Sequence, residues 1–356
     1  MSSRPLGRLG ALVAATVVLA ACSSAATPAP TAAPTKAPAS AAASVAPTAT
    51  PLPGTKTFSI AFTNAGISSA PMMAAIDSMN QAGYKIDMPI IEASELVTQG
   101  VASGQFAAGS GANNSSMAAV EKGANIRLVI SRVKNEWSVY ALNAIKDCAG
   151  LDGKKLAIHS EGAVSTAMLK NWIATKCPQA KPNYLVIAGS DNRLAAMLAN
   201  QIEASPVELG DAVTLDIKAS DRYHLIANFG ADLPDLQVTS VYFNTVWAAA
   251  NPGSVLDFVK AMLATYKKVD GNAAYLKEIS QKFVPNSLNK DTVDAAVKKY
   301  IDLKMFPVDG GITDKNLAYS AKFFGPAPDG IGATAKLMAV SSFADTTFLN
   351  LALTAK

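Results

Sequence analysis

Two short stretches of small polar residues could bind a ligand through backbone amides. The first is GSGANNSS at residues 109–116, which follows an apolar run at 105–108. The second is SEGA at residues 160–163, between a strand-like segment at 155–159 and a helix-like one that begins at Val164. Asn and Ser cap helix N-termini, glycine lets the backbone approach a ligand, and free amides at a helix start attract polar or anionic groups. We therefore expect the two helix starts to face each other across a cleft and hold one small ligand, although each stretch could be an ordinary strand-to-helix turn.

The elements that must position these stretches alternate between strand and helix. In the first part of the chain the pattern predicts strands at 57–62, 87–91, 105–108 and 126–131, with helices at 71–81, 94–102 and from 117 to Gly123. A second part repeats the scheme, with strands at 137–144, 155–159, 184–188 and 202–208 and helices at 164–176 and 192–200. Such alternation implies α/β units with largely parallel sheets and helices on both faces. Amphipathic helices at 255–268, 273–283 and 292–303 are expected to pack around the first part.

The residues offer little for catalysis. An enzyme needs a nucleophile or a matched acid and base in its pocket, and within the polar loops only His159 qualifies. No metal-ligand spacing is present. We therefore expect no catalytic residue, no cofactor and no metal.

The chain begins with an expected export signal. Arg4 and Arg8 precede an apolar segment at 9–19 that is too short for a comfortable bilayer crossing. The sequence LAAC at 19–22 resembles the lipobox of bacterial lipoproteins, which implies cleavage after residue 21 and a lipid on Cys22. A general secretory site with an incidental cysteine is the alternative.

Residues 22–54 are expected to form a disordered tether, because they are almost entirely Ala, Pro, Thr and Ser. The chain carries 31 Lys and Arg against 27 Asp and Glu, without a basic run. Nucleic acid is therefore not an expected partner.

Cys148 and Cys177 remain as an even pair in an oxidising compartment. They flank one strand and helix unit, so both should lie at its same end, where a disulfide could form. A metal site with His159 or His224 and a pair of free thiols are the alternatives.

Several segments together resemble the nitrate, sulfonate and taurine group of ABC transporter substrate-binding proteins. They are GQF at 104–106, EKGA at 121–124, LDGKKLAI at 151–158, NQIEA at 200–204 and NPGSVLDFVKA at 251–261. The resemblance implies a type II periplasmic binding protein fold, with two α/β lobes, two crossover strands and a ligand between the lobes. It assigns residues 55–141 and 241–356 to lobe I and residues 142–240 to lobe II.

The same resemblance places ligand contacts in four loops. They are Asn64 and Gly66; Ser110, Gly111, Asn113 and Asn114; His159, Ser160, Gly162, Ala163 and Ser165; and Glu208. At the last position Leu209 stands where the group often has a proline, so a surface charge is the alternative role of Glu208. None of the four loops contains Arg or Lys, although Arg193 could either reach inward or face the solvent. Trp137, Tyr140 or Tyr242 could supply a stacking face, with a place in the core as the alternative.

Together with the lipobox, the resemblance implies a monomeric, membrane-anchored, extracytoplasmic lipoprotein that captures a small polar or anionic solute and delivers it to an ABC permease. Closure of the lobes on the solute would be the signal that the permease recognises. An enzyme of the kind that makes the thiamine pyrimidine on the same fold, or a lipoprotein that binds a protein partner, are the alternatives.

Overall fold

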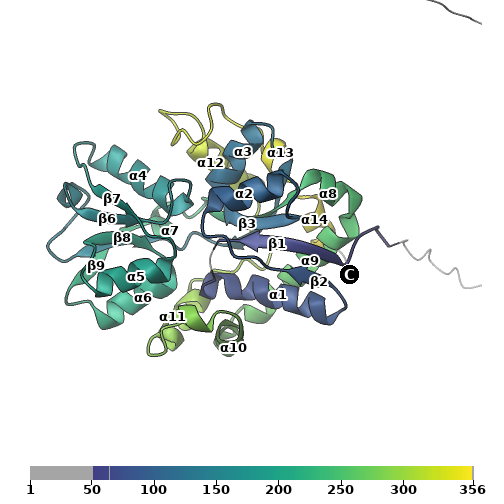
Figure 1. Ribbon diagram of the computed structural model, residues 1–356, viewed down its shortest axis with the longest axis horizontal. Coiled ribbons are helices and arrows are strands. Elements are labelled where there is room, and N and C mark those ends of the chain that lie inside the picture. Colours follow the sequence, from purple (N-terminus) through teal and green to yellow (C-terminus); the bar gives the residue numbers. More distant parts are fainter. Residues whose placement is uncertain (1–50, 64, 355–356) are drawn as a thin grey trace, which may run out of the picture. The chain divides into compact units, whose positions relative to one another are not determined.

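The computed structural model describes residues 51–63 and 65–354. The predicted signal, Cys22, the tether as far as residue 50, and Asn64 lie outside these residues, whereas Pro53 at the end of the predicted tether accepts a hydrogen bond from the backbone N–H of Gly253 at 2.8 Å. Within them, two five-stranded sheets belong to one compact unit. Figure 1 shows the two sheets side by side, each between helices. The two-lobed α/β fold expected from the sequence is therefore confirmed.

The first sheet has the strand order β2-β1-β3-β10-β4. Its strands are β1 (Thr57–Phe62), β2 (Lys85–Asp87), β3 (Ala108–Ala112), β4 (Ile126–Val133) and β10 (Thr239–Asn244). Strands β1, β2 and β3 pair in parallel, whereas β10 is antiparallel to both β3 and β4. A single strand that returns from the other sheet thus interrupts an otherwise parallel sheet.

The second sheet repeats this plan with the order β7-β6-β8-β5-β9. Its strands are β5 (Ser138–Leu142), β6 (Lys155–Ile158), β7 (Asn183–Val186), β8 (Ala204–Val207) and β9 (Tyr223–Asn228). Here β5 is the antiparallel strand between β8 and β9. Because β5 pairs wholly in this sheet, the chain passes from one lobe to the other at residues 134–137 and returns at 229–238.

Helices connect the strands of each lobe. In the first lobe they are α1 (Ala70–Gln81), α2 (Ser94–Ala102) and α3 (Asn113–Glu121), and in the second α4 (Val164–Lys176), α5 (Ser190–Leu198) and α6 (Leu209–Lys218). Pro71 stands in the first turn of α1, where its missing N–H leaves no bond unmade. Gly83, at φ 92°, lets the chain turn back toward β2.

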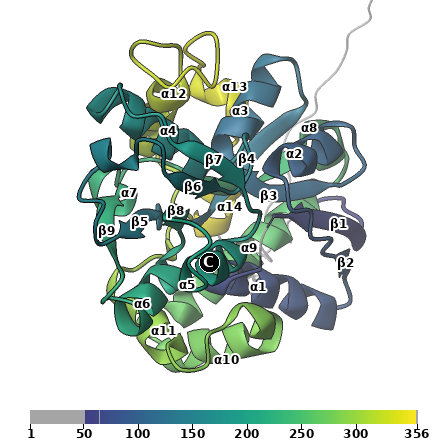
Figure 2. The same cartoon turned by 60° about the vertical axis from the view of Figure 1, so that its left-hand side comes forward.

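The C-terminal part is helical. It contains α7 (Phe229–Asp232), α8 (Thr245–Ala250), α9 (Pro252–Val269), α10 (Ala273–Phe283), α11 (Val293–Asp302), α12 (Asp314–Phe324), α13 (Val340–Phe343) and α14 (Thr347–Thr354). Short 3-10 turns occur at η1 (Ile67–Ser69), η2 (Ala149–Leu151) and η3 (Pro285–Ser287). The predicted amphipathic helices are confirmed as α9, α10 and α11, and α9 and α10 pack on α1. Figure 2 shows α6 of the second lobe beside α11.

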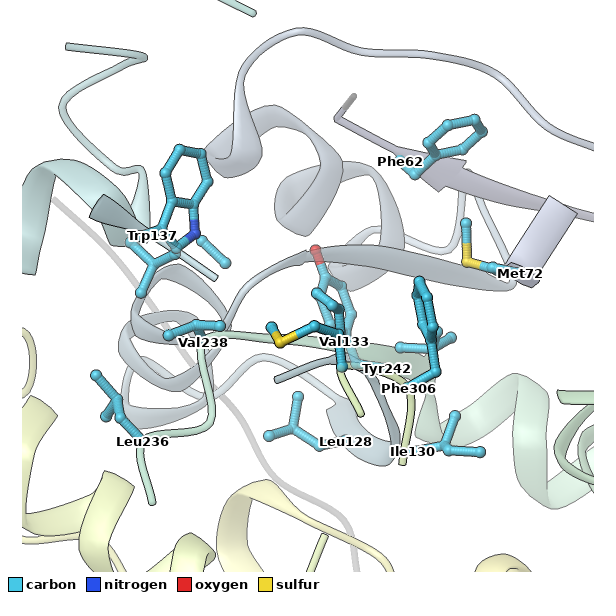
Figure 3. Close-up of a cluster of buried hydrophobic side chains, with 14 of the residues drawn as sticks. Phe62, Met72, Leu128, Ile130, Val133, Trp137, Leu236, Val238, Tyr242 and Phe306 are labelled. Carbon is cyan, nitrogen blue, oxygen red and sulfur yellow. The ribbon is translucent and has the colours of Figure 1, made fainter. Parts of the chain in front are cut away.

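One hydrophobic core includes residues of both crossover segments (Figure 3). Trp137 comes from the first crossover, and Leu236 and Val238 come from the second. They join Tyr242 of β10, whose side chain is fully buried. Burying one large apolar side chain stabilises the fold by about 1.5–3 kcal/mol, so the crossovers are fixed to the first lobe by packing.

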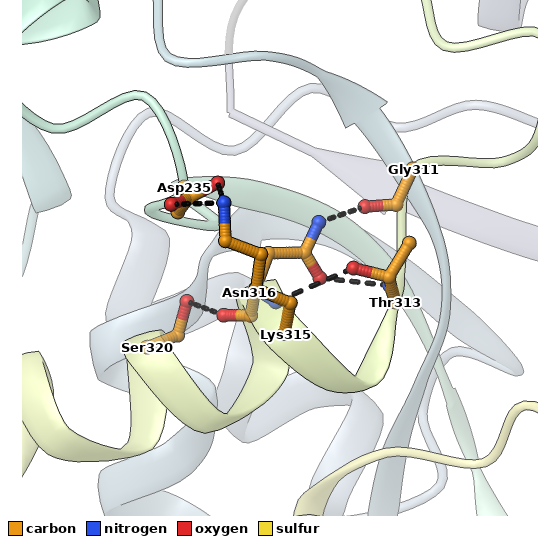
Figure 4. A network of polar contacts seen from close by, with 6 residues as sticks. All are labelled: Asp235, Gly311, Thr313, Lys315, Asn316 and Ser320. Carbon is orange, nitrogen blue, oxygen red and sulfur yellow. Dashed lines mark hydrogen bonds and ion pairs between the residues drawn. The ribbon is translucent and has the colours of Figure 1, made fainter.

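The start of α12 holds the second crossover in place (Figure 4). The Thr313 side chain accepts from the backbone N–H of Asn316, and the Asn316 side chain accepts from that of Thr313, which completes a capping box. Lys315 pairs with Asp235 of the crossover at 2.8 Å, and Ser320 accepts a hydrogen bond from the backbone of Gln237 at 2.9 Å. The return segment is therefore anchored at both polar and apolar positions.

Candidate functional site

The two predicted helix starts meet between the lobes. The Asn114 amide and the Ser115 hydroxyl, in the first turn of α3, donate to the backbone carbonyl of Gly162 at 3.0 and 2.7 Å. Gly162 lies just before α4, in the other lobe. Because both donors reach one carbonyl, these helix starts are in direct contact at this rim.

A second pair of contacts joins the lobes beside the first. The Ser160 hydroxyl donates to the Glu95 carboxylate at 3.2 Å, and His159 Nε2 lies 2.6 Å from the carbonyl oxygen of Glu92. His159 Nδ1 accepts from the backbone N–H of Gly189 at 3.1 Å, so Nε2 carries the proton and donates. Burial and then the charge of Arg193 lower the pKa of His159. The imidazole is therefore neutral, and both of its nitrogens are engaged by the protein.

Ser110 and Gly111 lie inside a strand and not in a turn. The sequence predicted a strand at 105–108 followed by a polar turn, but β3 spans Ala108–Ala112 and α3 begins directly at Asn113. A Cβ atom at Gly109 would lie 3.0 Å from the Tyr242 ring, and one at Gly111 would lie 3.1 Å from the Tyr242 hydroxyl. These two glycines therefore give room to Tyr242 on the neighbouring strand.

Asn113 holds the start of α3 against the second crossover. Its backbone N–H donates to Val238 at 3.0 Å, and its side-chain amide donates to the carbonyl oxygen of Gln237 at 2.9 Å and to Ser240 Oγ at 3.1 Å. Asn113 is fully buried. Its amide group thus has a structural partner, whereas its Oδ1 has none.

Several buried polar atoms of the two helix starts have no hydrogen-bond partner among the residues that the structure describes. They are Oδ1 of Asn113, Oδ1 of Asn114, Oγ of Ser165 and Oγ1 of Thr166. A buried polar atom without a partner costs about 1–3 kcal/mol. Water or a bound solute between the lobes would remove this cost.

The remaining predicted contacts lie at helix starts of both lobes. Gly66 precedes η1, Ala163 precedes α4 and Glu208 precedes α6. Gly66 and Glu208 line one small cavity of about 30 Å³, together with Asp211, Ser190 and residues of α11. Glu208 is buried and is not a surface charge. A larger hollow of about 810 Å³ runs along the crossover segments and is lined by residues of both lobes, among them Glu136 and Tyr140.

Arg193 reaches inward. It is fully buried, and its Nε donates to Ser205 Oγ and to the carbonyl oxygen of Pro206, each at 3.1 Å. Its Nη2 has no partner. Its guanidinium carbon lies 5.9 Å from the centre of the Trp137 ring, and burial lowers the pKa of Arg193 to about 10.

Sequence reasoning missed a buried group of ionisable side chains beside Glu208. Arg132 comes from the end of β4, Glu136 from the first crossover, Asp211 from α6 and Tyr300 from α11. Tyr300 donates to the Glu136 carboxylate. Burial and then the negative charge of Glu208 raise the pKa of Glu136 to about 8, and burial raises that of Asp211 to about 7. The charged residues Arg132, at the end of the apolar strand β4, and Glu136, just before the apolar strand β5, were the signal that could have identified the crossover as part of the site.

Two of the three candidate stacking rings are engaged elsewhere. Tyr140 donates to Asp216 at 2.8 Å, and the Tyr242 hydroxyl lies 3.0 Å from Thr98 Oγ1 in the first lobe. Trp137, beside Arg193, is the one that lies at the crossover between the lobes.

Cys148 and Cys177 form a disulfide, with their Cα atoms 5.8 Å apart. The bond closes the end of the β6 and α4 unit that lies away from the helix start of α4. Among residues 51–63 and 65–354, no group of three or more metal-ligating side chains occurs, and no helix is both long and apolar enough to span a bilayer.

Three solved structures illustrate the similarity of the fold. The ligand-binding component of an ABC-type import system from Staphylococcus aureus is 13% identical, with a TM-score of 0.66 over 83% of this chain and 98% of that chain. The alkanesulfonate-binding protein SsuA from Xanthomonas axonopodis pv. citri is 15% identical, with a TM-score of 0.59 over 76% and 91%. The nitrate-binding protein NrtA from Synechocystis PCC 6803 is 14% identical, with a TM-score of 0.55 over 68% and 70%. The fold is therefore that of a periplasmic binding protein.

A search of curated proteins finds no match. The family model described as NMT1/THI5 like, in contrast, matches residues 80–272, which is more than half of the chain. The matched segment runs from α1 to the loop before α10 and so includes both crossovers and the whole second lobe. The chain therefore belongs to the NMT1/THI5-like family.

Proposed function

We propose that the protein is an extracytoplasmic solute-binding component of an ABC importer, which closes its two lobes on a small polar molecule. The observation that carries this proposal is the pair of hydrogen bonds from Asn114 and Ser115 to Gly162, which joins the two helix starts across the lobes. The buried polar atoms without partners at the same helix starts supply a reason for a solute to bind there.

Closure follows from differential affinity. A solute that contacts both lobes binds the closed form more tightly than the open form, and so shifts the population toward closure. A second set of contacts joins the lobes between α6 and the residues just before α11. Thr214 and Thr292 lie 2.7 Å apart, and Lys218 forms an ion pair with Asp291. The closed form is the conformation that a permease would recognise.

The proposed solute contacts are the four predicted loops, together with the buried residues beside them. Asn114, Ser165 and Glu208 are the predicted contacts with the strongest support, because they are buried at helix starts that face the other lobe. His159 is proposed to bridge the lobes in the closed form, because its two nitrogens are engaged there. Solute binding without catalysis is proposed, since a neutral histidine with both nitrogens engaged is a poor general base.

A thermal-shift screen of oxyanions, sulfonates, pyrimidines and flavin-like vitamins tests the proposal. A ligand of the folded state at about 100 times its Kd stabilises that state by about 2.7 kcal/mol and raises the Tm. Small-angle scattering should then show a smaller radius of gyration with the same ligand. A ligand that raises the Tm without reducing the radius of gyration would contradict closure. If no compound in the screen raises the Tm, solute binding would be contradicted.

We propose further that a lipid on Cys22 anchors the protein as a monomer to the outer face of the cell membrane, with residues 23–54 as a tether. Cys22→Ser should release the protein from the membrane fraction into the soluble extracytoplasmic fraction. Retention of the variant in membranes would contradict the anchor.

A further inference from the structure

The hollow of about 810 Å³ along the crossover segments lies apart from the helix starts of α3 and α4. Its lining includes Ser131 of β4 and Leu225 of β9, which are edge strands of the two sheets. The helix starts follow β3 and β6, and β10 separates β3 from β4, while β8 and β5 separate β6 from β9. The hollow is therefore on the far side of the crossover strands from those helix starts.

Helix α6 separates the hollow from the small cavity beside Glu208. Asp211 and Thr214 line the small cavity, whereas Val213 and Asp216 line the hollow. At 3.6 residues per turn these two pairs lie on opposite faces of the helix. The hollow is therefore a space of its own, and among the described residues none of the predicted solute contacts lines it.

The hollow has the size and the apolar wall of a ligand pocket. Pockets for small molecules usually hold about 300–1,000 Å³ and are lined mainly by apolar side chains. Three large apolar side chains of its lining are exposed, Leu225 at 43%, Leu303 at 48% and Val308 at 38%. Leu225 belongs to the second lobe and the other two to the first. An apolar occupant that covers them would be stabilised by removing this surface from water.

Every lysine of the lining has a free ammonium group. Lys134 lies in the first crossover, Lys299 in α11 and Lys304 just after α11, and all three are exposed. Within residues 51–63 and 65–354, none of the three ammonium groups has an ion-pair or hydrogen-bond partner. The backbone N–H of Lys134 donates to the carbonyl oxygen of Met305 at 3.0 Å, which brings Lys134 beside the segment of Lys304.

The carboxylates of the lining, in contrast, are mostly engaged within the protein. Four of the five accept a hydrogen bond or form an ion pair, and they are Glu136, Asp216, Asp235 and Asp309. Figure 4 shows the pair between Asp235 and Lys315. Asp270 is the exception among the described residues. The charged groups that remain free are therefore mainly cationic, which favours an anionic partner.

A buried amide in the lining also lacks an acceptor. Gln237 of the second crossover is only 4% exposed, and its Nε2 has no hydrogen-bond partner among the residues that the structure describes. A buried donor without a partner is costly. An acceptor group on an occupant, or a water held beside it, would remove that cost.

We propose that the hollow is a second binding site, for an amphiphilic anion with a carboxylate or phosphate group on one apolar chain. The anionic group would lie at the three free lysines, and the chain would cover the three exposed apolar side chains of both lobes. A neutral molecule with the same chain would leave the ammonium groups without a partner. A short anion would leave the apolar wall in water.

Compounds with one octyl chain test this chemistry directly. Octanoate and octyl phosphate carry the anion, octan-1-ol is neutral, octan-1-amine is cationic, and acetate keeps the carboxylate without the chain. Titration calorimetry on the full chain should give one or both octyl anions an affinity at least about tenfold higher than that of the other three compounds. Added salt should weaken the binding of the anions and leave that of octan-1-ol unchanged.

Lys134→Gln with Lys299→Gln tests the place of the anionic group. The double variant removes two of the three free cations, so affinity for the octyl anion that binds more tightly should fall about fivefold or more. Lys260→Gln is the matched control, because Lys260 is an exposed lysine of α9 that does not line the hollow. It should leave the affinity unchanged.

Leu225→Ser tests the place of the chain. Leu225 is exposed, so the variant should fold, and affinity for the same anion should fall about threefold or more because less apolar surface is covered. Ile217→Ser is the matched control, since Ile217 is 53% exposed on α6 of the same lobe and does not line the hollow. Circular dichroism should show that all four variants are folded.

The outcomes separate this inference from the proposed function. If neither octyl anion binds, or if octan-1-ol or octan-1-amine binds as tightly as the anions, the proposal is wrong. If the anions bind but the lysine and leucine variants bind them like the native protein, the hollow is not their site and the proposal also fails. The proposed solute capture stands in each case, because the screen and the compaction of the lobes test it separately.

Discussion

Removing the hydrogen bonds that join the two helix starts should open the protein without unfolding it. Asn114→Ala with Ser115→Ala deletes both donors to the Gly162 carbonyl. Within residues 51–63 and 65–354, neither side chain makes another hydrogen bond that would hold its own lobe together. The double variant therefore changes the balance between the lobes and leaves the packing within each lobe intact.

The magnitude follows from the two contacts. A hydrogen bond of this kind contributes about 0.5–1.5 kcal/mol, so losing both destabilises the closed form by about 1–3 kcal/mol. The ratio of closed to open protein should then fall by roughly 5- to 150-fold. The affinity of a solute that requires closure should fall by up to the same factor.

Small-angle scattering of the free protein and calorimetry with a solute from the screen measure both effects. The neighbouring substitution Asn113→Ala is the matched control. Asn113 donates to Gln237 of the second crossover and to Ser240 of β10, and neither bond reaches the helix starts of the second lobe, so its loss should lower the Tm by several degrees and leave the radius of gyration unchanged. Equal radii and equal affinities for the double variant and the native protein would refute the reasoning.

Three other substitutions test the packing, the crosslink and the buried charge. Gly109→Ala should lower the free energy of unfolding by about 1–3 kcal/mol, because the added Cβ would lie 2.8–3.0 Å from side chains of α2 and β10. Gly210→Ala is the control, since the nearest atom to its Cβ would be 3.5 Å away. Equal free energies of unfolding for the two variants in chemical denaturation would contradict this. The double variant Cys148→Ser, Cys177→Ser should lower the free energy of unfolding by about 2–4 kcal/mol, because the disulfide joins residues 29 positions apart and restricts the unfolded chain. Its Tm should be lower than that of the native protein and should not change with reductant. An unchanged Tm would argue against the crosslink. Burial raises the pKa of Glu136 from 4.5 to about 8 in the folded protein. Between these pH values the folded protein keeps a proton that the unfolded chain has lost. The free energy of unfolding should therefore fall by a few kcal/mol as the pH rises from about 4.5 to 8, and then level off. Glu136→Gln should flatten this slope, and a native protein that gains stability across the window would show that the carboxyl is not held neutral.

The alternation of elements could be read from the sequence because it depends on local properties. Strand β1 has alternating β-formers, and Pro71 begins α1 where a proline is tolerated. Helices α9 to α11 repeat apolar residues at helical spacing. The polar stretches at the starts of α3 and α4 were found for the same reason, since small polar residues differ in composition from the elements on either side, although the N-cap residues are Ala112 and Ala163 and not the expected Asn or Ser.

The exact use of these stretches could not be read in the same way. The sequence predicted a turn at Gly109 and Gly111, but pairing with β10 extends β3 through them, and the Tyr242 ring fills the space that the missing side chains leave. That pairing joins residues about 130 positions apart, which local composition does not encode.

What the sequence by itself determined is the class of the fold and the two helix starts, because helix capping, strand alternation and glycine composition act over a few neighbouring residues. The tertiary structure alone decided which polar groups are used up and which remain available. Tyr300 of α11 reaches Glu136 of the first crossover across 164 residues of sequence, and the charges of Glu208 and Arg132 both act on Glu136. Burial, which the sequence alone does not reveal, shifts the pKa values of Glu136, Asp211 and Arg193 toward their neutral forms.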